Sequence, residues 1–476
     1  MNTLSLKRKK ILYSYILSSP ILFTIGLFFS TLYHTPFPFM LAFSFLYLFT
    51  ILYSIKKFGL MSLYTIYTFT SAFFMYDCIF MTLMFSDKNF LVQTFPVKYT
   101  FSIDIGMKFL ICCFIAVFSS HVSYCFFFKK DNKGLQIRTL IKGSKSIKKI
   151  AVFLCILFAF PLAYKIYLQL SFVRSHGFSA VYTSGFTNIK YPFWCSGAFL
   201  LFNSAYYIFL ATKPSKKEFL FVTSIYIFMY VFNSLKGGRG GIIALFVVTF
   251  YLLVKEYKIT VNIKKVICFF IFIIFFIMGI TSIRQSYEVN TVQNKTSVSV
   301  GKVIKELLWD QTTSRAVPML IMRGNLKYHP YPFLFTPITE RFITIFHKYK
   351  AASIESIENL NDPSIVLIAN VQMYGALTGR GYGSALLGEA YECYGIIGIV
   401  FFYVLVSFII SVLEARCLNF RGIFIPFFYV LLTTIPIIPR KEILQLLKYN
   451  LNSLVVCYIL FFAILVFVRY GGKSIK

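Results

Sequence analysis

A glycine-rich segment around one arginine is the first candidate in this sequence for a ligand-binding site. Residues 236–241 read Lys-Gly-Gly-Arg-Gly-Gly and directly precede an apolar segment. Glycines let the backbone turn tightly and approach a ligand, and the free N–H groups of a following helix favour an anion. Since the arginine fork matches phosphate oxygens, Gly238, Arg239 and Gly240 are predicted to contact an anionic ligand. The alternative is a tight turn whose arginine reaches lipid headgroups.

Four further arginines lie near the ends of apolar segments or between them. Arg284 closes one segment, Arg380 shortly precedes another, and Arg440 closes a third, whereas Arg341 lies in the long polar stretch. A pyrophosphate is costly to desolvate unless several cations pair with it. Arginines that converge on one cavity would supply those cations. The alternative is a belt of arginines that contact lipid phosphates at the membrane interface.

Glu389 and His347 are the candidates for proton transfer. Residues 388–391 read Gly-Glu-Ala-Tyr and lead into Tyr-Gly-Ile-Ile-Gly at 394–398. A carboxylate at the start of an apolar segment is costly unless it is solvated, paired or functional. Glu389 could therefore act as a general base, accept a hydroxyl, or hold an arginine. His347 suits proton abstraction near neutral pH, although a histidine in a polar loop can equally be only solvated.

Other polar residues lie within apolar segments. Lys108 and Lys165 are expected to reach the interface or to pair, and Asp104 lies at the spacing that favours an ion pair with Lys108. His121 is interpreted as a buried histidine. The sequence has no Walker A motif, no HExxH, no His/Asp metal cluster and no DxD pair in the long polar stretch, so no metal and no cofactor are predicted.

Composition places these residues in an integral membrane protein. The 476 residues are 58% hydrophobic and have a mean hydropathy of +0.73, which soluble domains rarely approach. Apolar runs recur that are long enough to cross a hydrocarbon core of roughly 30 Å, and we predict an all-α polytopic membrane protein with about 12 transmembrane helices. The predicted segments are 11–31, 37–55, 61–85, 101–128, 150–170, 191–212, 218–235, 241–255, 266–283, 395–413, 423–438 and 451–468.

Lysine and arginine gather in alternate short loops, and this sets the predicted orientation. Both termini are expected in the cytoplasm, with the five arginines on the opposite face. Most of the net charge of +31 is then explained by the orientation of the chain in the membrane, so nucleic acid is not expected as a partner. The predicted organisation is nine transmembrane helices in 1–283, one long periplasmic loop with short helices in 284–382, and three transmembrane helices in 383–476.

The order and placement of these motifs resemble the Wzy-type O-antigen polymerases, which join oligosaccharide repeat units. The resemblance covers most of the chain. It comprises the arginine turn at 237–240, Arg284 at the end of the next outward segment, the long loop, and Gly-Ser-Ala-Leu-Leu-Gly-Glu-Ala-Tyr at 383–391. The chain is also similar to the enterobacterial common antigen polymerase and, more distantly, to the O-antigen ligases.

The resemblance implies a glycosyltransferase of the bacterial inner membrane that works on the periplasmic face in lipopolysaccharide biosynthesis. A glycan on undecaprenyl pyrophosphate would be the donor, a lipid-linked repeat unit the acceptor, and no metal would be needed. Such polymerases typically work with a polysaccharide chain-length regulator. By resemblance, Glu389 or a loop imidazole such as His347 would activate the acceptor hydroxyl. Five arginines would hold the anionic groups: Arg239, Arg284 and Arg440 the pyrophosphate, and Arg380 or Arg341 a phosphate or sugar.

Two other functions fit part of the pattern. A ligase would make one transfer onto lipid A-core, but the long loop has no convincing equivalent of the ligases' catalytic histidine motif. A lipid-linked oligosaccharide flippase or other transporter would spread charged residues through the interior of its helices. It would not need arginines gathered at one face beside a long loop. The polymerase interpretation is therefore favoured.

Overall fold

The computed structural model describes most of the apolar segments of the chain, and every regular element among them is a helix. The described residues are 2–87, 89–92, 100–128, 144–176, 189–236, 240–260, 318–319, 321–323, 385–416, 425–440 and 445–471, with single positions between 262 and 279. The predicted all-α architecture is confirmed for this part of the chain. Most of the predicted loop 284–382 lies outside it.

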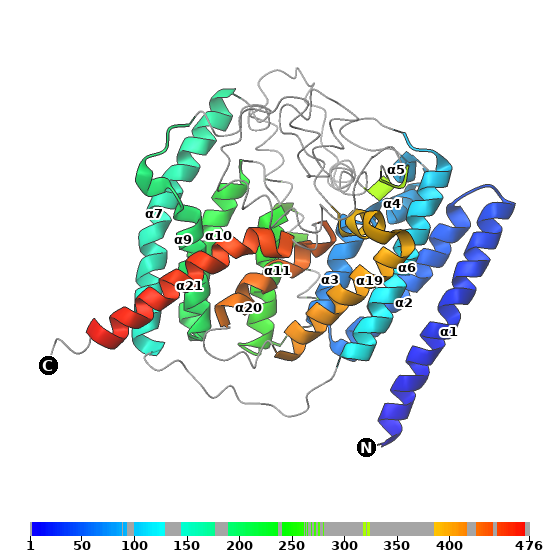
Figure 1. Ribbon diagram of the computed structural model, residues 1–476, viewed down its shortest axis with the longest axis horizontal. Coiled ribbons are helices and arrows are strands. Elements are labelled where there is room, and N and C mark those ends of the chain that lie inside the picture. The colour runs from blue at the N-terminus through cyan, green and yellow to red at the C-terminus, as the bar shows by residue number, and fades with distance from the viewer. Residues whose placement is uncertain are drawn as a thin grey trace. The chain divides into compact units, whose positions relative to one another are not determined.

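The helices fall into two compact units, which are described separately. The first contains α1 (Asn2–Leu32), α2 (Phe37–Phe58), α3 (Leu63–Phe74), α4 (Asp77–Phe85), α5 (Asn89–Val92), α6 (Ile103–Phe127) and α19 (Leu386–Arg416) (Figure 1). The second contains α7 (Ser144–His176), η1 (Phe193–Cys195), α9 (Ala198–Ala211), α10 (Lys216–Ser234), α11 (Gly240–Lys255), α20 (Ile425–Leu432) and α21 (Gln445–Gly471). The short helix η3 (Ile435–Arg440) follows α20.

Five described helices are long and apolar enough to cross a membrane, and a bent pair would make a sixth. The bent pair is α3 and α4, which meet at 57° where the sequence predicts one segment at 61–85. Tyr76 has φ −106° and ψ 2°, so the helix is interrupted there and restarts at Asp77, whose charge suits a helix N-terminus. The count of about 12 spans stays a prediction.

Close packing between α1 and α2 depends on a glycine. A Cβ on Gly26 would lie 2.8 Å from the Cβ of Ala42 and 3.3 Å from the Cα of Phe39. Small residues let helix backbones approach in this way when no water drives their association. The hydroxyls of Tyr15 and Thr50 bond across the same pair at 3.0 Å, and this adds a polar tie inside an apolar contact.

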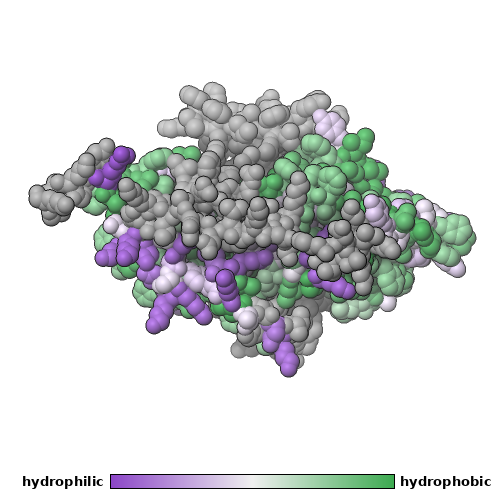
Figure 2. Space-filling view, turned by 90° about the horizontal axis from the view of Figure 1, so that it is seen from below, coloured by the Kyte–Doolittle hydropathy of each residue, from purple (hydrophilic) through white to green (hydrophobic). Residues whose placement is uncertain are grey.

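Large apolar side chains stay exposed on the outward face of several helices. Along α1, Leu17 is 68% exposed, and Ile21 and Phe28 are exposed on the same side. Figure 2, a view from below, shows both apolar and hydrophilic side chains among the described residues of that face. In water such stripes would be costly, whereas hydrocarbon solvates them. The chain is therefore a membrane protein, as its composition predicts.

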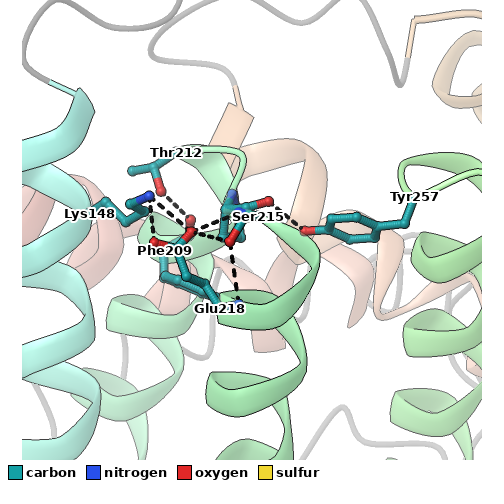
Figure 3. A network of polar contacts seen from close by, with 7 residues as sticks. Lys148, Phe209, Thr212, Ser215, Glu218 and Tyr257 are labelled. Atoms are coloured by element: carbon teal, nitrogen blue, oxygen red, sulfur yellow. Dashed lines mark hydrogen bonds and ion pairs between the residues drawn. The ribbon is translucent and has the colours of Figure 1, made fainter.

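In the second unit, α7 and α10 start at the same end. Lys148 of α7 pairs with the Glu218 carboxylate of α10 at 2.7 Å, and Glu218 forms a capping box with Ser215 (Figure 3). The side chain of Gln169, near the other end of α7, accepts a hydrogen bond from Lys236, just beyond α10. The two helices therefore run parallel.

The two polar contacts of α7 are separated by one bilayer thickness. From Lys148 to Gln169 the helix rises about 32 Å at 1.5 Å per residue, which matches a hydrocarbon core of roughly 30 Å. Each contact thus satisfies polar groups where the helix meets water. The segment between them is apolar, with a hydropathy of 2.1 in its most apolar window.

Cysteine labelling tests this transverse placement of α7 and α10. Lys190→Cys and Lys217→Cys, each exposed, are introduced into a chain whose native cysteines are replaced by alanine. We expect a membrane-impermeant maleimide to label position 190 in intact spheroplasts and position 217 only after permeabilisation. Labelling of both positions from one side would contradict a transmembrane placement of these helices.

Candidate functional site

The structure describes part of the predicted site. It places the side chains of Glu389 and Arg440 and the backbone of Gly240, which begins α11. The other predicted site residues lie outside the described part of the chain: Arg239, Gly238, Arg284, Arg341, His347 and Arg380.

Glu389 lies in the first turn of α19, where it is 5% exposed. A helix N-terminus favours a negative charge, and this position lowers the cost of burying the carboxylate. Gly388 lets a second segment come close, because a Cβ there would lie 3.3 Å from the backbone nitrogen of Pro318. Residues 318–319 and 321–322 are helical, within the stretch where short helices are predicted. The carboxylate is thereby covered by protein.

A break after Cys393 separates this first part of α19 from the rest of the helix. Gly395 has φ +60° and ψ −135°, a conformation that L side chains rarely adopt. A Cβ on Gly398 would lie 2.0 Å from the carbonyl oxygen of Ala390, so only glycine fits there. The Tyr-Gly-Ile-Ile-Gly pattern therefore meets the conformational needs of a kink in α19, and this kink separates the turn that carries Glu389 from the rest of the helix.

Lys108 of α6 reaches the same turn. Its ammonium donates to the carbonyl oxygen of Met322 at 3.4 Å and lies 5.2 Å from the ring centroid of Tyr391. The ion pair predicted between Lys108 and Asp104 is wrong, because among the described residues the salt bridge lies between Lys148 and Glu218 and these two side chains form none. Both side chains are exposed, and Lys108 instead contacts a separate segment at Met322.

Glu392 adds a second carboxylate one helical turn after Glu389. Its Oε1 atom is buried and has no hydrogen-bond partner among the described residues. Residues three apart on a helix share a face, so the two carboxylates are neighbours. Like charges on neighbouring carboxylates repel, and paired carboxylates of this kind are used for proton transfer in many enzymes.

Arg440 lies at the bend between α3 and α4. Its guanidinium carbon is 6.0 Å from the ring centroid of Phe74, the last residue of α3, and this is a cation–π contact. Asp77, buried at 4% exposure, starts α4 three residues later. The contact fixes the direction of an arginine that the sequence assigns to the anion site.

The sequence did not single out a cluster that precedes the glycine-rich turn in the second unit. The Lys236 ammonium donates to Gln169 Oε1 at 2.5 Å, and Gln169 Nε2 donates to the hydroxyl of Tyr191 at 3.0 Å. Lys165 lies 5.2 Å from the ring centroid of Tyr191. Burial, and then the positive charge of Lys165, lower the pKa of Lys236 to about 8. The sequence offered one signal for this cluster. The topology argument that singled out arginines on the predicted outer face applies equally to lysines on that face.

Comparison of the sequence with known protein families shows the family to which the chain belongs. The family model for the O-antigen polysaccharide polymerase Wzy matches residues 11–470, nearly the whole chain. The chain belongs to the O-antigen polysaccharide polymerase Wzy family. Searches of curated proteins and of solved structures found no match. Family membership confirms the resemblance and makes the chain a membrane-bound, glycosyltransferase-like polymerase of lipopolysaccharide biosynthesis.

The described histidine of the membrane core is not part of this site in the Wzy-family chain. His121 is 0% exposed, its Nδ1 lies 3.3 Å from the Tyr64 hydroxyl, and the rings of Tyr15 and Tyr53 meet it edge-on. The prediction of a buried histidine is confirmed. Within the described residues no group of three or more His, Cys, Asp or Glu side chains could hold a metal ion.

The kink in α19 gives a direct test. Gly398→Ala puts a methyl group against the Ala390 carbonyl, so the first turn must shift, at a cost of about 1–3 kcal/mol. We expect a lower midpoint of thermal unfolding in detergent and reduced polymerisation, because Glu389 moves with that turn. Gly279→Ala is the matched control, since nothing lies within 4 Å of its Cβ position. Equal behaviour of the two variants would show that the close approach at Gly398 is unimportant.

Proposed function

We propose that this Wzy-family chain joins undecaprenyl-pyrophosphate-linked repeat units into polysaccharide at the periplasmic face of the inner membrane. The growing glycan on its lipid carrier is the donor, and one lipid-linked repeat unit is the acceptor. A hydroxyl of the acceptor attacks the anomeric carbon of the donor, the bond from that carbon to the pyrophosphate breaks, and undecaprenyl pyrophosphate leaves. The family match over residues 11–470 is the observation that carries this proposal.

Glu389 takes the proton of the attacking hydroxyl in this proposal. The support is its burial at the start of α19, with Glu392 one turn away and Lys108 reaching the same turn. A carboxylate shielded from water is a stronger base than one in solvent, and a nearby lysine limits how much negative charge the site must carry. His347 is the second candidate for the same step.

The arginines stabilise the leaving pyrophosphate. Negative charge grows on the phosphate oxygens as the glycosidic bond breaks, so fixed cations lower the barrier. Arg239, Arg284 and Arg440 are proposed to hold the pyrophosphate, and Arg380 and Arg341 to contact a phosphate or sugar. Support comes from Gly240, which follows Arg239 in the sequence and begins α11 at a helix N-terminus, and from the contact of Arg440 with Phe74.

The membrane topology follows from the same proposal. Both termini are cytoplasmic, and the loops that follow α7 and α10 face the periplasm together with the arginine turn. Polar contacts at both ends of α7, one bilayer apart, support this placement. A chain-length regulator is the proposed protein partner, because the lengths of such polymers are usually set by a second membrane protein.

The first experiment is the lipopolysaccharide banding pattern of a strain that lacks this chain. Without it we expect one repeat unit on the core, and with the wild-type chain a ladder. Arg239→Ala should abolish the ladder at equal expression, because the leaving pyrophosphate loses a cation. Arg174→Ala is the control, since Arg174 is exposed in the last turn of α7. A normal ladder with Arg239→Ala would overturn its role, and loss of even the single unit in the deletion would indicate a ligase or flippase.

A second experiment concerns the base. Glu389→Gln keeps the shape of the side chain but cannot accept the proton, so initial polymerisation should slow by about 10²–10⁴-fold. Asp104→Asn, an exposed carboxylate at the start of α6, should polymerise like the wild type. Wild-type rates for Glu389→Gln together with loss of activity for His347→Ala would move the base to the imidazole.

A further inference from the structure

A cavity of about 440 Å³ lies between two loops at one end of the first unit. Thr35 and Phe37 line it from the connection between α1 and α2, and Ser86 and Asp87 line it from the connection that follows α4. Asn89, the first residue of α5, also lines it. Sites for small molecules occupy about 300–1,000 Å³, so the cavity is large enough for such a ligand.

The two loops owe their course to residues in the left-handed conformation. His34, just after α1, has φ +49°, and Ser86, which caps the end of α4, has φ +52°. A left-handed residue after a helix ends it and turns the chain sharply. Both helices therefore end abruptly, and the loops that follow them border the same space.

The polar groups of the cavity suit a ligand that carries several hydroxyls. Neither the Thr35 hydroxyl nor the Ser86 hydroxyl has a hydrogen-bond partner among the described residues. Asp87 accepts the backbone N–H of Asn89 on Oδ1 at 2.9 Å, which leaves its second oxygen for a ligand. Hydroxyl groups both donate and accept hydrogen bonds, and a carboxylate is a strong acceptor.

Charge and an aromatic ring narrow the class of ligand further. The described residues that line the cavity include Asp87 but no lysine, arginine or histidine, so a phosphate or another anion would be repelled there. The side chain of Phe37 is 39% exposed. A sugar ring carries hydroxyls at its edge and apolar C–H groups on its face, so it could bond to the polar groups while its face covers Phe37.

The cavity lies at the end of the unit that is proposed to face the periplasm. Phe37 is the first residue of α2, whereas Lys56 and Lys57 lie in its last turn. Lysines gather on the cytoplasmic side of membrane proteins, which places the start of α2 on the opposite side. In Figure 1, α4 and α5 lie at the end of this unit away from the N-terminus.

Packing places the turn that carries Glu389 at the same end. The helix α5 contacts the start of α6, where a Cβ on Gly106 would lie 3.1 Å from Leu91 Cδ2. Two residues further along α6, Lys108 lies 5.2 Å from the ring centroid of Tyr391 in the first part of α19. The cavity and the candidate base thus belong to neighbouring elements of one unit.

We propose that this cavity binds a neutral sugar residue of the glycan substrate through Thr35, Ser86 and Asp87, with Phe37 against the face of the sugar ring. The inference rests on the proposed function. It adds a site for the sugar part of a substrate whose phosphate part is assigned to the arginines. Asp87 is a binding residue, and the proton transfer stays with Glu389.

Oligosaccharide binding tests the proposal without requiring polymerisation. The full chain in phosphatidylcholine nanodiscs is titrated with the free repeat-unit oligosaccharide, released from the O-antigen of the host strain, and followed by saturation-transfer NMR. Asp87→Asn keeps an oxygen for the Asn89 N–H but removes the charge. We expect it to bind the oligosaccharide about tenfold more weakly, as loss of a hydrogen bond to a charged group does. Asp104→Asn, an exposed carboxylate outside the cavity, should bind like the wild type.

A second pair of variants tests the aromatic contact. Phe37→Leu should weaken binding by about threefold to tenfold, because the sugar loses apolar contact area. Phe45→Leu is the matched control, since Phe45 is 62% exposed on the same helix and does not line the cavity. Absence of saturable binding by the wild type would overturn the site. Equal affinities for Asp87→Asn, Phe37→Leu and their two controls would overturn it as well.

The outcomes separate this site from the proposed function. If a strain that lacks the chain still makes a ladder while Asp87→Asn loses oligosaccharide binding, polymerisation by this chain fails and the sugar site stands. If the ladder requires the chain and the variants bind like their controls, this inference alone fails.

Discussion

A hydrocarbon layer of roughly 30 Å offers no hydrogen bonds and little solvation for charge, and this constraint governs the described structure. Along α7, the Lys148–Glu218 pair and the Gln169–Lys236 bond stand at the two margins of such a layer. Between those margins the helices present apolar side chains outward. Polar groups that remain inside, such as the hydroxyls of Tyr15 and Thr50, bond to each other. Charge is thereby concentrated at the ends of the helices, which is where an amphipathic lipid-linked substrate would present its phosphates.

The same constraint explains how an acidic side chain can lie at the start of a membrane helix. Glu389 is covered by the segment around Pro318, and the kink at Gly395 changes the direction of α19 after its first turns. Without the kink, the first turns of α19, which carry Glu389, would continue along the axis of the rest of the helix. Glycine is required twice, once for a left-handed backbone at Gly395 and once for close approach at Gly398. The two glycines at 395 and 398 are therefore required for two different physical reasons.

The charged side chains of the described helices are satisfied in different ways. A salt bridge such as Lys148–Glu218 satisfies its own charges and holds two helices. Lys236 bonds instead to the amide oxygen of Gln169, and burial together with the charge of Lys165 lowers the pKa of Lys236 to about 8. Arg440 lies over the ring of Phe74, which is a cation–π contact. Its role toward pyrophosphate stays a prediction.

The sequence alone determined the class of the protein and its family, because hydrophobic length, charge placement and motif order are local properties of the chain. It also placed a helix start at 241, one residue from the observed start of α11 at Gly240, since glycines interrupt the apolar run visibly. The roles of Glu389 and Arg440 stay predictions. It did not find the contact between Gln169 and Lys236, 67 positions apart, or the segment that covers Glu389. It also paired Lys108 with Asp104, whereas the lysine reaches Met322 on another segment. Tertiary structure decided these partners, because a polar group in a membrane protein bonds to whichever group the packing of helices brings within reach.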